Sequence, residues 1–349
     1  MKSLTLSKRL LLVLSALLPI GLGASAHAKD DDDSDEGGAA GDDMTLRIRT
    51  AAPEKSPWGE LLSNVAQRIK TDSKDRIKVK IYWQVKSEAS AVRACTKGKA
   101  GGIAVSLGAI ASAVPELDAT EIPYLFDDYK QADKALEAAR PLMTEILAAK
   151  GFVFAIRGEN GFRQWASKTS FLTTPTAFKG RTMRSQPSSV HKAMYSALGA
   201  TPSPLQISEV PTSLTNGAID GYDNTLLFAR LANWSDGVQY ITMSNHIYQG
   251  AAVVWCQKWF EKLPADLREV MTRRDAKTIE TEKGGLALVR VFNDKLMPEQ
   301  YKKANKQMKE LSGGERAALK AALASVETDF AKSTSDKGRE LLKVIKANR

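Results

Sequence analysis

Two arginines lie at positions from which they could bind an anion. Arg163 follows the residues Asn-Gly-Phe at 160–162, and Arg184 ends the segment Phe-Lys-Gly-Arg-Thr-Met-Arg at 178–184. Each lies in a short extended segment just after a glycine turn, so a rigid backbone could aim the guanidinium inward. A planar fork of N–H donors matches a carboxylate through two parallel hydrogen bonds. The pattern predicts an acid-binding cleft, and the alternative is that both arginines are ordinary surface cations.

Patterns typical of catalytic and metal sites are missing from the sequence. It has three histidines, and neither His191 nor His246 has a second ligand at metal-binding spacing. There is no G-x-S-x-G elbow, no Walker loop and no G-x-G-x-x-G fingerprint. Asp and Glu are abundant, so a hydrolytic carboxylate pair stays open, but no pair stands out. These observations favour a binding protein that needs no cofactor and no metal.

Further motifs follow the two arginine segments in order. They read Gly-Ala-Thr-Pro at 199–202, Ser-Glu-Val at 208–210 and Asn-Gly-Ala-Ile-Asp-Gly at 216–221. Glu-Ile-Pro-Tyr-Leu-Phe at 121–126 and Trp-Phe-Glu-Lys-Leu-Pro at 259–264 extend the pattern on either side. The whole set resembles the periplasmic solute-binding receptors of TRAP transporters, the DctP-like family, over roughly residues 46–342.

The resemblance implies an α/β protein with a two-domain periplasmic-binding-protein-like fold, a cleft between the domains and a long bridging helix. It implies a receptor and not an enzyme, with Arg184 in a central ion pair with the ligand and Arg163 at a second contact. The remaining implied ligand-binding residues are two polar and four aromatic side chains: Gln186, Asn224, Trp58, Phe126, Trp165 and Tyr222. Without the resemblance, the polar pair would be turn residues and most of the aromatic residues would belong to the core.

The chain departs from the family pattern at three places. Pro211 stands where an aromatic residue is usual, and Tyr222 with Asp223 replaces a small residue and Glu. Residues 83–88 read Trp-Gln-Val-Lys-Ser-Glu in place of a glycine-rich segment. These departures bear on the ligand more than on the fold. The sequence does not name the ligand, because one arginine serves dicarboxylates, keto acids, sugar acids and aromatic acids alike.

The N-terminus has the features of a signal peptide. A basic segment precedes the apolar residues 10–20, and Ala26-His27-Ala28 fits a small-x-small cleavage site. We therefore expect residues 1–28 to be removed after Ala28 and the protein to reach the periplasm. Residues 29–43 are rich in Asp and Glu and predict a disordered acidic spacer, for which calcium binding is a weaker alternative. No later apolar run is long enough to cross a bilayer, so we do not expect a membrane-embedded protein.

The charge of the chain favours small anionic partners. The whole sequence has a formal net charge of +10, and without the three basic residues of the signal peptide and without the acidic spacer the remaining body carries +14. Such an excess of positive charge raises the rate at which the protein encounters anions. Nucleic acid is disfavoured, because no zinc-finger spacing, helix-turn-helix signal or aromatic-basic pattern is present and the chain is expected to be exported.

The sequence contains two cysteines, Cys95 and Cys256. An oxidising compartment would allow them to pair, but sequence does not show whether their Cα atoms come within bonding distance. Cys95 lies in a helical pattern and Cys256 at the end of an apolar strand. Two separate buried thiols are the preferred prediction, and a disulfide is the alternative.

Apolar periodicity predicts the elements that position these residues. A strand at 45–51, a helix beginning at Ser56-Pro57 and a strand at 77–83 indicate a parallel α/β sheet. Residues 129–150 predict a helix that is kinked or restarted at Pro141, and 265–305 predict a nearly continuous helix. Other expected elements are strands at 103–106, 152–156, 163–166, 181–184, 240–243 and 250–256, helices at about 188–198 and from Ser208 to Gly217, and two terminal helices after 311–314.

The resemblance divides the body into two domains, each made of two segments. Domain I is predicted to comprise 44–160 plus 251–290, and domain II 161–250 plus 291–349. The partners it implies are a small organic acid and the membrane subunits of a TRAP transporter driven by an ion gradient. Two rival functions are a periplasmic enzyme acting on an anionic substrate and a sensor protein that reports a bound acid to a receptor kinase.

Overall fold

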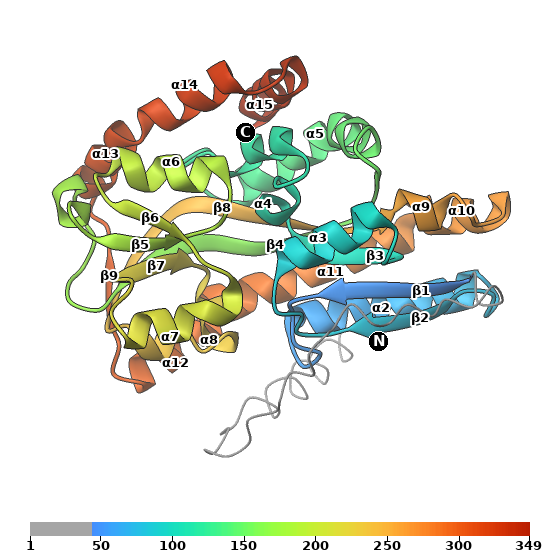
Figure 1. Cartoon of the computed structure of the whole chain (residues 1–349), viewed down its shortest axis with the longest axis horizontal. Coiled ribbons are helices and arrows are strands. Elements are labelled where there is room, and N and C mark those ends of the chain that lie inside the picture. The colour runs from blue at the N-terminus through green and yellow to red at the C-terminus, as the bar shows by residue number, and fades with distance from the viewer. Residues whose placement is uncertain (1–43) are drawn as a thin grey trace, which may run out of the picture.

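The computed structural model describes residues 44–349, drawn in colour in Figure 1. The predicted signal peptide at 1–28, its cleavage after Ala28 and the acidic spacer at 29–43 lie outside the described residues.

The described part of the chain begins with the predicted strand, helix and strand, which are confirmed. β1 (Thr45–Thr50) pairs in parallel with β2 (Lys78–Tyr82) and with β3 (Gly102–Ser106). The connecting helix α2 (Pro57–Asp72) begins at Pro57, and the Oγ of its N-cap Ser56 accepts a hydrogen bond from the Gly59 amide at 3.1 Å. Helix α3 (Glu88–Lys97) is capped in the same way by Ser87. This end of the molecule is therefore a parallel βαβ unit.

Two long strands run through the centre of the sheet. Residues 152–156 and 163–166, predicted as separate strands, belong to one strand, β4 (Phe152–Ser167), and 240–243 and 250–256 both belong to β8 (Tyr240–Cys256). The two strands pair antiparallel along nearly their whole length. The pairing shifts register near Phe154, Glu159 and Arg163. Such bulges interrupt the alternation of side chains without ending the strand, which is why the sequence suggested shorter, separate strands.

The strands form one mixed sheet in the order β2-β1-β3-β8-β4-β7-β5-β6, with β9 paired to β8. Figure 1 shows the blue N-terminal strands at one end of this sheet, the green and yellow strands at the other, and β4 with β8 between them. The strands of the second half are β5 (Thr182–Ser185), β6 (Thr201–Pro204), β7 (Gly221–Asn224) and β9 (Gln307–Glu310). Sequence periodicity did not predict the four-residue strands β6, β7 and β9, although β5, which is equally short, was predicted.

The helices of the middle region follow the predictions with two corrections. α5 (Tyr129–Ala148) passes through Pro141 without restarting, and α6 (Ser189–Ala197) lies where expected. The helix expected from Ser208 is a short 3-10 turn, η3 (Ile207–Glu209), followed by α7 (Val210–Thr215), and its N-cap is Gln206 in a capping box with Glu209. The other elements here are α4 (Leu107–Ile110), η1 (Pro115–Glu121), η2 (Pro175–Phe178), α8 (Leu226–Leu231) and η4 (Ser235–Gly237).

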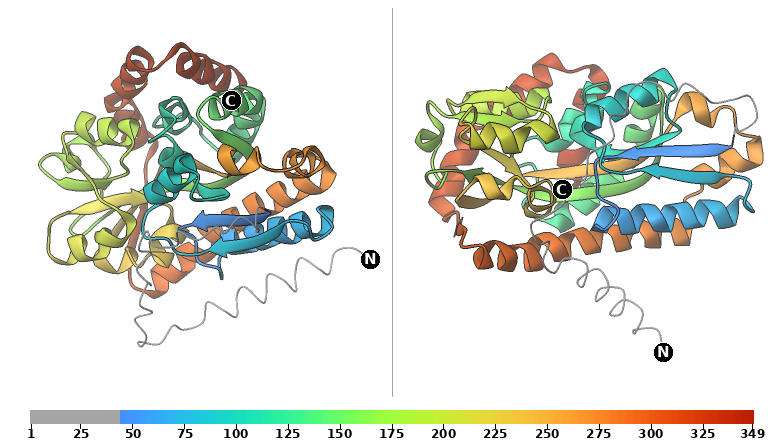
Figure 2. Two further views of the ribbon diagram at one scale, coloured as in Figure 1. Left: turned by 45° about the vertical axis from the view of Figure 1, so that its right-hand side comes forward. Right: turned by 60° about the horizontal axis from the view of Figure 1, so that its bottom comes forward.

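The long helical stretch is segmented. It consists of α10 (Ala265–Thr272), α11 (Ala276–Val291), a π-helical turn η5 (Phe292–Leu296) and α12 (Met297–Lys303), after the short α9 (Gln257–Phe260). The interruption after α10 is followed by a new cap, because the Asp275 carboxylate accepts the Thr278 amide at 2.9 Å. Figure 2 (right) shows α11 and the helical stretch that continues from it to α12 running along one side of the molecule. Three terminal helices follow, not two: α13 (Gly313–Ala322), α14 (Ala324–Ser333) and α15 (Asp336–Asn348).

A disulfide joins Cys95 and Cys256, so the preferred prediction of two separate thiols was wrong. The topology explains the pairing. Helix α3 leads directly into β3, and the start of β3 at Gly102 pairs with Trp255, next to Cys256 at the end of β8. The helix thereby brings Cys95 to a Cα–Cα distance of 5.2 Å, which suits a disulfide.

Candidate ligand-binding site

Strand β7 lies between the strands that carry the two predicted arginines. Arg184 on β5 is opposite Tyr222 of β7, and Gln164 of β4, next to Arg163, is opposite Asn224 at the end of β7. Gln186 follows β5 by one residue. The sheet thus brings together five of the eight predicted site residues: both arginines, Gln186, Asn224 and Tyr222.

Arg163 is paired inside the protein. Its Nε donates to the Asp223 carboxylate, its Nη2 to the Asp223 main-chain oxygen, and its Nη1 to Gln249 Oε1 at 2.8 Å and Asn224 Oδ1 at 3.4 Å. Burial alone would raise the pKa of Asp223, but Arg163 together with the nearby histidines holds that pKa well below its usual value. The charge of Arg163 is therefore balanced without a ligand.

Arg184 is buried as deeply but is not balanced. It is 4% exposed, its Nε and Nη2 donate to the Leu205 carbonyl at 3.3 and 3.1 Å, and its guanidinium lies 4.7 Å from the ring centroid of Trp234. It forms no ion pair with any side chain within residues 44–349. Burial, with a contribution from Arg163, lowers the pKa of Arg184 to about 10, which still leaves it charged at neutral pH. A buried cation without a counter-ion is costly, and an anionic ligand would relieve that cost.

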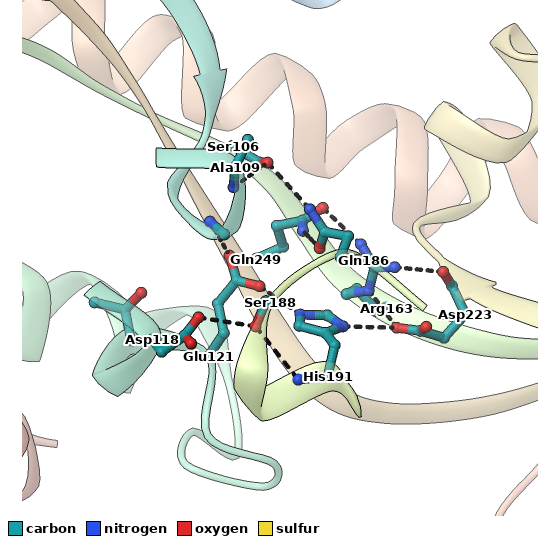
Figure 3. A network of polar contacts seen from close by, with 12 residues as sticks. Ser106, Ala109, Asp118, Glu121, Arg163, Gln186, Ser188, His191, Asp223 and Gln249 are labelled. Carbon is teal, nitrogen blue, oxygen red and sulfur yellow. Dashed lines mark hydrogen bonds and ion pairs between the residues drawn. The ribbon is translucent and has the colours of Figure 1, made fainter. Parts of the chain in front are cut away.

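A chain of polar contacts connects Arg163 to the N-terminal half of the protein. Gln249, which accepts from Arg163, donates through Nε2 to Gln186 Oε1 at 2.6 Å. Gln186 in turn donates to Ser106 Oγ at 3.2 Å, and Figure 3 shows these side chains converging from different elements. The chain of contacts ends at Glu88, because the amide and the hydroxyl of Ser106 each donate to the Glu88 carboxylate at 2.9 Å. The predicted residue Gln186 therefore lies in the middle of a network and not in an open turn.

Glu88 is a partly buried acid close enough to Arg184 to interact with it electrostatically. Burial raises the pKa of the Glu88 carboxyl, and the two hydrogen bonds from Ser106 and the charge of Arg184 partly oppose that rise. The preceding residue, Ser87, donates to Gln206 Oε1 at 2.5 Å, next to the Leu205 carbonyl that holds Arg184. Glu88 and Arg184 thus approach one another from two different parts of the chain.

The four predicted aromatic residues are all buried, and their described contacts belong mainly to the core. Trp58 donates through Nε1 to the Glu159 carbonyl at 3.1 Å, and Phe126 packs edge-on against Tyr248 with centroids 5.7 Å apart. Trp165 stacks on His246 with a centroid separation of 4.0 Å. Tyr222 alone of the four is connected to Arg184, by strand pairing and through Trp234, whose ring it contacts edge-on at 5.3 Å. Ligand contact by all four, Trp58, Phe126, Trp165 and Tyr222, stays a prediction.

Several residues of the site were not singled out from the sequence. Trp234 lies between the short helix α8 and the 3-10 turn η4 and was not among the predicted ligand-binding residues. Asp223 and Glu88 appeared only as departures from the family pattern, and Gln249 lies inside a long strand. The signal that could have found Glu88 is its place at the first turn of a capped helix just after a strand.

A second buried network adjoins the first. His191 at the start of α6 contacts Glu121 of η1 through Nε2 at 2.6 Å, and its Nδ1 lies 3.7 Å from Asp223. Ser188, the N-cap of α6, donates to Asp118 at 2.8 Å, as Figure 3 shows. Within residues 44–349 no group of three or more His, Cys, Asp or Glu side chains is placed to hold a metal ion.

Comparisons with known proteins identify the family of this chain. The profile of the family described as bacterial extracellular solute-binding protein, family 7, matches residues 48–334. The C4-dicarboxylate-binding periplasmic protein DctP of Rhodobacter capsulatus is 30% identical over 236 residues, 67% of this chain and 68% of that protein. A solute-binding protein of Verminephrobacter eiseniae is 30% identical over 226 residues, 63% of this chain and 67% of that protein.

Solved structures show the same fold. The sugar acid binding protein DctPAm of Advenella mimigardefordensis, in complex with galactonate, matches with a TM-score of 0.79 and 25% identity, covering 87% of this chain and 98% of that chain. A TRAP periplasmic solute-binding protein of Roseobacter denitrificans matches in fold with a TM-score of 0.81 at 18% identity, covering 87% of this chain and all of that one. The predicted two-domain periplasmic-binding-protein fold is thereby confirmed.

These are families of binding proteins and not of enzymes. Within the described residues, no helix combines the length and apolar character that a membrane crossing requires. The resemblance drawn from the two arginine segments is confirmed, and the chain belongs to family 7 of the bacterial extracellular solute-binding proteins, the DctP family of TRAP periplasmic receptors.

Proposed function

We propose that this receptor binds a small organic acid through an ion pair between Arg184 and a ligand carboxylate, and delivers it to the membrane subunits of a TRAP transporter. The observation that carries the proposal is the buried Arg184, which lacks a counter-ion among the described residues while the neighbouring Arg163 has one. A carboxylate could form hydrogen bonds with the guanidinium and neutralise its charge. The names of relatives support an acid, since one binds C4-dicarboxylates and another was solved with galactonate.

Gln186 and Asn224 are proposed to complete the site as polar neighbours of that carboxylate. Both are nearly buried and both are connected to Arg163, Gln186 through Gln249 and Asn224 directly. In this proposal Arg163 acts mainly as a positioning residue, because the Asp223 carboxylate already balances its charge. A second contact between Arg163 and the ligand, implied by the resemblance, stays part of the prediction.

The ligand is proposed to enter by the parting of two domains, 44–160 plus 251–290 and 161–250 plus 291–349. Several bonds cross this boundary: Ser87 to Gln206, Gln186 to Ser106, and His191 to Glu121. Contacts that exist only in a closed state would let ligand binding shift the population toward closure. The predicted crossing after residue 290 falls beside the π-helical turn η5, which supports a boundary there.

Membership of a periplasmic receptor family supports export, and we propose cleavage after Ala28. N-terminal sequencing of the secreted protein should then begin at Lys29. A sensor that reports a bound acid to a kinase is the rival for the last step. Loss of uptake of the bound acid on deletion of the gene, with transporter subunits present, supports delivery, whereas unchanged uptake favours the sensor.

The central test is calorimetric titration with the acid identified by mass spectrometry of natively purified protein. Arg184→Ala should weaken binding by about two to four decades, since a carboxylate left buried without its partner costs roughly 3–5 kcal/mol. Arg184→Lys should recover only part of the affinity, because one ammonium does not reproduce two parallel hydrogen bonds. Arg268→Ala on the exposed face of α10 is the control and should bind normally. Near wild-type affinity in Arg184→Ala would remove the basis of the proposal.

A further inference from the structure

Opposite charges from two parts of the chain meet at the proposed site without pairing. Arg184 comes from β5, and Glu88 is the first residue of α3. Each influences the pKa of the other, yet they form no ion pair among the described residues. Two neighbouring residues connect them indirectly. Arg184 donates to the Leu205 carbonyl, and Ser87, next to Glu88, donates to the Gln206 side chain.

Among residues 44–349, the site has one cation that is not paired with a carboxylate, Arg184. The charge of Arg163 is taken by Asp223, and three of its four hydrogen bonds go to the side chains of Asp223, Asn224 and Gln249. Arg184 is left to compensate one carboxylate. A second carboxylate on the same small molecule would have no free guanidinium here, and toward the α3 side it would meet the like charge of Glu88. Like charges brought together in a poorly solvated site repel strongly.

The groups around Glu88 suit hydroxyls. Ser87, Ser106, Gln186 and Gln206 are neutral side chains that can both donate and accept hydrogen bonds. Gln186 and Ser106 are nearly buried and bonded to each other at 3.2 Å. The Glu88 carboxylate accepts from Ser106 and keeps lone pairs for a further donor, because each ionised oxygen can accept more than one hydrogen bond.

We propose that the ligand is a hydroxylated monocarboxylic acid whose carboxylate binds Arg184 and whose hydroxyl donates to Glu88, and that Glu88 selects against dicarboxylates. The inference rests on the proposed function of the same site. It makes Glu88 a specificity-determining residue, contributed by the α3 side, opposite the carboxylate-binding strand β5. Burial already raises the pKa of the Glu88 carboxyl, so a second anion beside it would be opposed further, whereas a hydroxyl donor would stabilise the ionised form.

Two acids of equal chain length provide the test. D-erythronate has four carbons with three hydroxyls and one carboxylate, and succinate has four carbons with two carboxylates. In calorimetric titration of the wild-type protein, D-erythronate or one of the longer hydroxy acids galactonate and D-glucuronate should bind at least about 100-fold more tightly than succinate. Glu88→Gln should narrow that ratio of affinities to roughly tenfold or less, because it weakens the binding of the hydroxy acid and removes the repulsion between Glu88 and succinate.

Two variants make the outcome specific. Glu145→Gln removes a carboxylate that is 63% exposed and paired with Lys337 at 3.2 Å, and it should leave the ratio unchanged. Arg184→Ala should weaken all acids together, since it removes the carboxylate contact that they share. Thermal unfolding of each variant without ligand shows that a change in binding does not come from loss of the fold.

Failure of this inference is distinguishable from failure of the proposed function. Succinate binding as tightly as every hydroxy acid, or a Glu88→Gln ratio equal to that of the wild type, would overturn the role of Glu88 while leaving an acid receptor. Co-purification of a dicarboxylate or a hydroxyl-free acid would overturn it too, as would the absence of binding to all four acids. If no carboxylic acid of any kind binds, the proposed function itself is wrong.

Discussion

Arg163 and Asp223 form an ion pair in which the two side chains are only 1% and 0% exposed. Arg184, on a neighbouring part of the same sheet, is buried as well but has no carboxylate partner among residues 44–349. In the sequence both arginines lie in extended segments after a glycine turn, and only the family resemblance assigned Arg184 the central role. Their environments separate them into a structural cation that orders the site and an unbalanced cation that is available to a ligand.

The first prediction concerns the stability of the ligand-free protein. Arg163→Ala leaves Asp223 buried without its partner, and we expect the free energy of unfolding to fall by about 3–5 kcal/mol. Arg184→Ala removes a cation that has no such partner and should change stability much less. Urea unfolding followed by circular dichroism compares the two variants directly. Equal losses of stability would contradict the division of roles.

The second prediction concerns pH and His246. Burial, with a contribution from Arg163 and His191 against the opposing effect of Asp223, lowers the pKa of His246 to about 4. The unfolded state, with an ordinary pKa near 6.5, therefore binds a proton between about pH 6.5 and 4 when the folded state does not. Stability present above pH 6.5 should be lost as the pH falls through this range, by an amount on the order of 3 kcal/mol.

His246→Gln is the comparison for that prediction, since it removes the titrating ring. Unfolding free energies of wild type and variant, measured by urea titration at several values between pH 7.5 and 4.5, should give a flatter curve for the variant. Parallel curves would show that His246 is not the group responsible.

The third prediction concerns the disulfide between Cys95 and Cys256. The two residues are 161 positions apart, and a cross-link closing so long a loop restricts the unfolded chain strongly. Replacing both cysteines by Ser should lower the free energy of unfolding by about 2–5 kcal/mol. Thiol titration of the denatured protein should find no free thiol before reduction and two after it. Two thiols without reductant, or a melting temperature insensitive to reductant, would speak against the bond.

The fourth prediction concerns Trp234, which lies against the Arg184 guanidinium and donates through Nε1 to the Ile207 carbonyl at 3.2 Å. Trp234→Phe keeps a ring beside Arg184 but loses this hydrogen bond, so stability should fall by about 1 kcal/mol. Ligand affinity should fall by roughly three- to tenfold, because a smaller ring holds the guanidinium less firmly. Calorimetric titration and thermal unfolding measure the two effects. Unchanged affinity would mean that Trp234 only fills the core.

The local elements of the fold could be predicted where the residue pattern is long or carries a cap. The helix after Ser56-Pro57 begins where a hydroxyl cap and a first-turn proline require it, and alternating apolar residues mark β1 and β2. The single strands β4 and β8 were divided wrongly, because a bulge interrupts the alternation of side chains without ending the strand. Strand β7 escaped prediction, since its backbone pairing depends on neighbours distant in the sequence.

The sequence by itself indicated a solute-binding receptor, through a family resemblance carried by glycine turns, arginines and helix signals in an ordered pattern over most of its length. Only the tertiary structure decided which charges are balanced. Whether an arginine is free or paired depends on carboxylates brought close by the sheet, such as Asp223 beside Arg163, 60 residues apart. The same holds for Cys95 with Cys256 and for Glu88 near Arg184. Charge compensation and covalent pairing depend on distance in space, which strand order and register set and which spacing along the chain does not reveal.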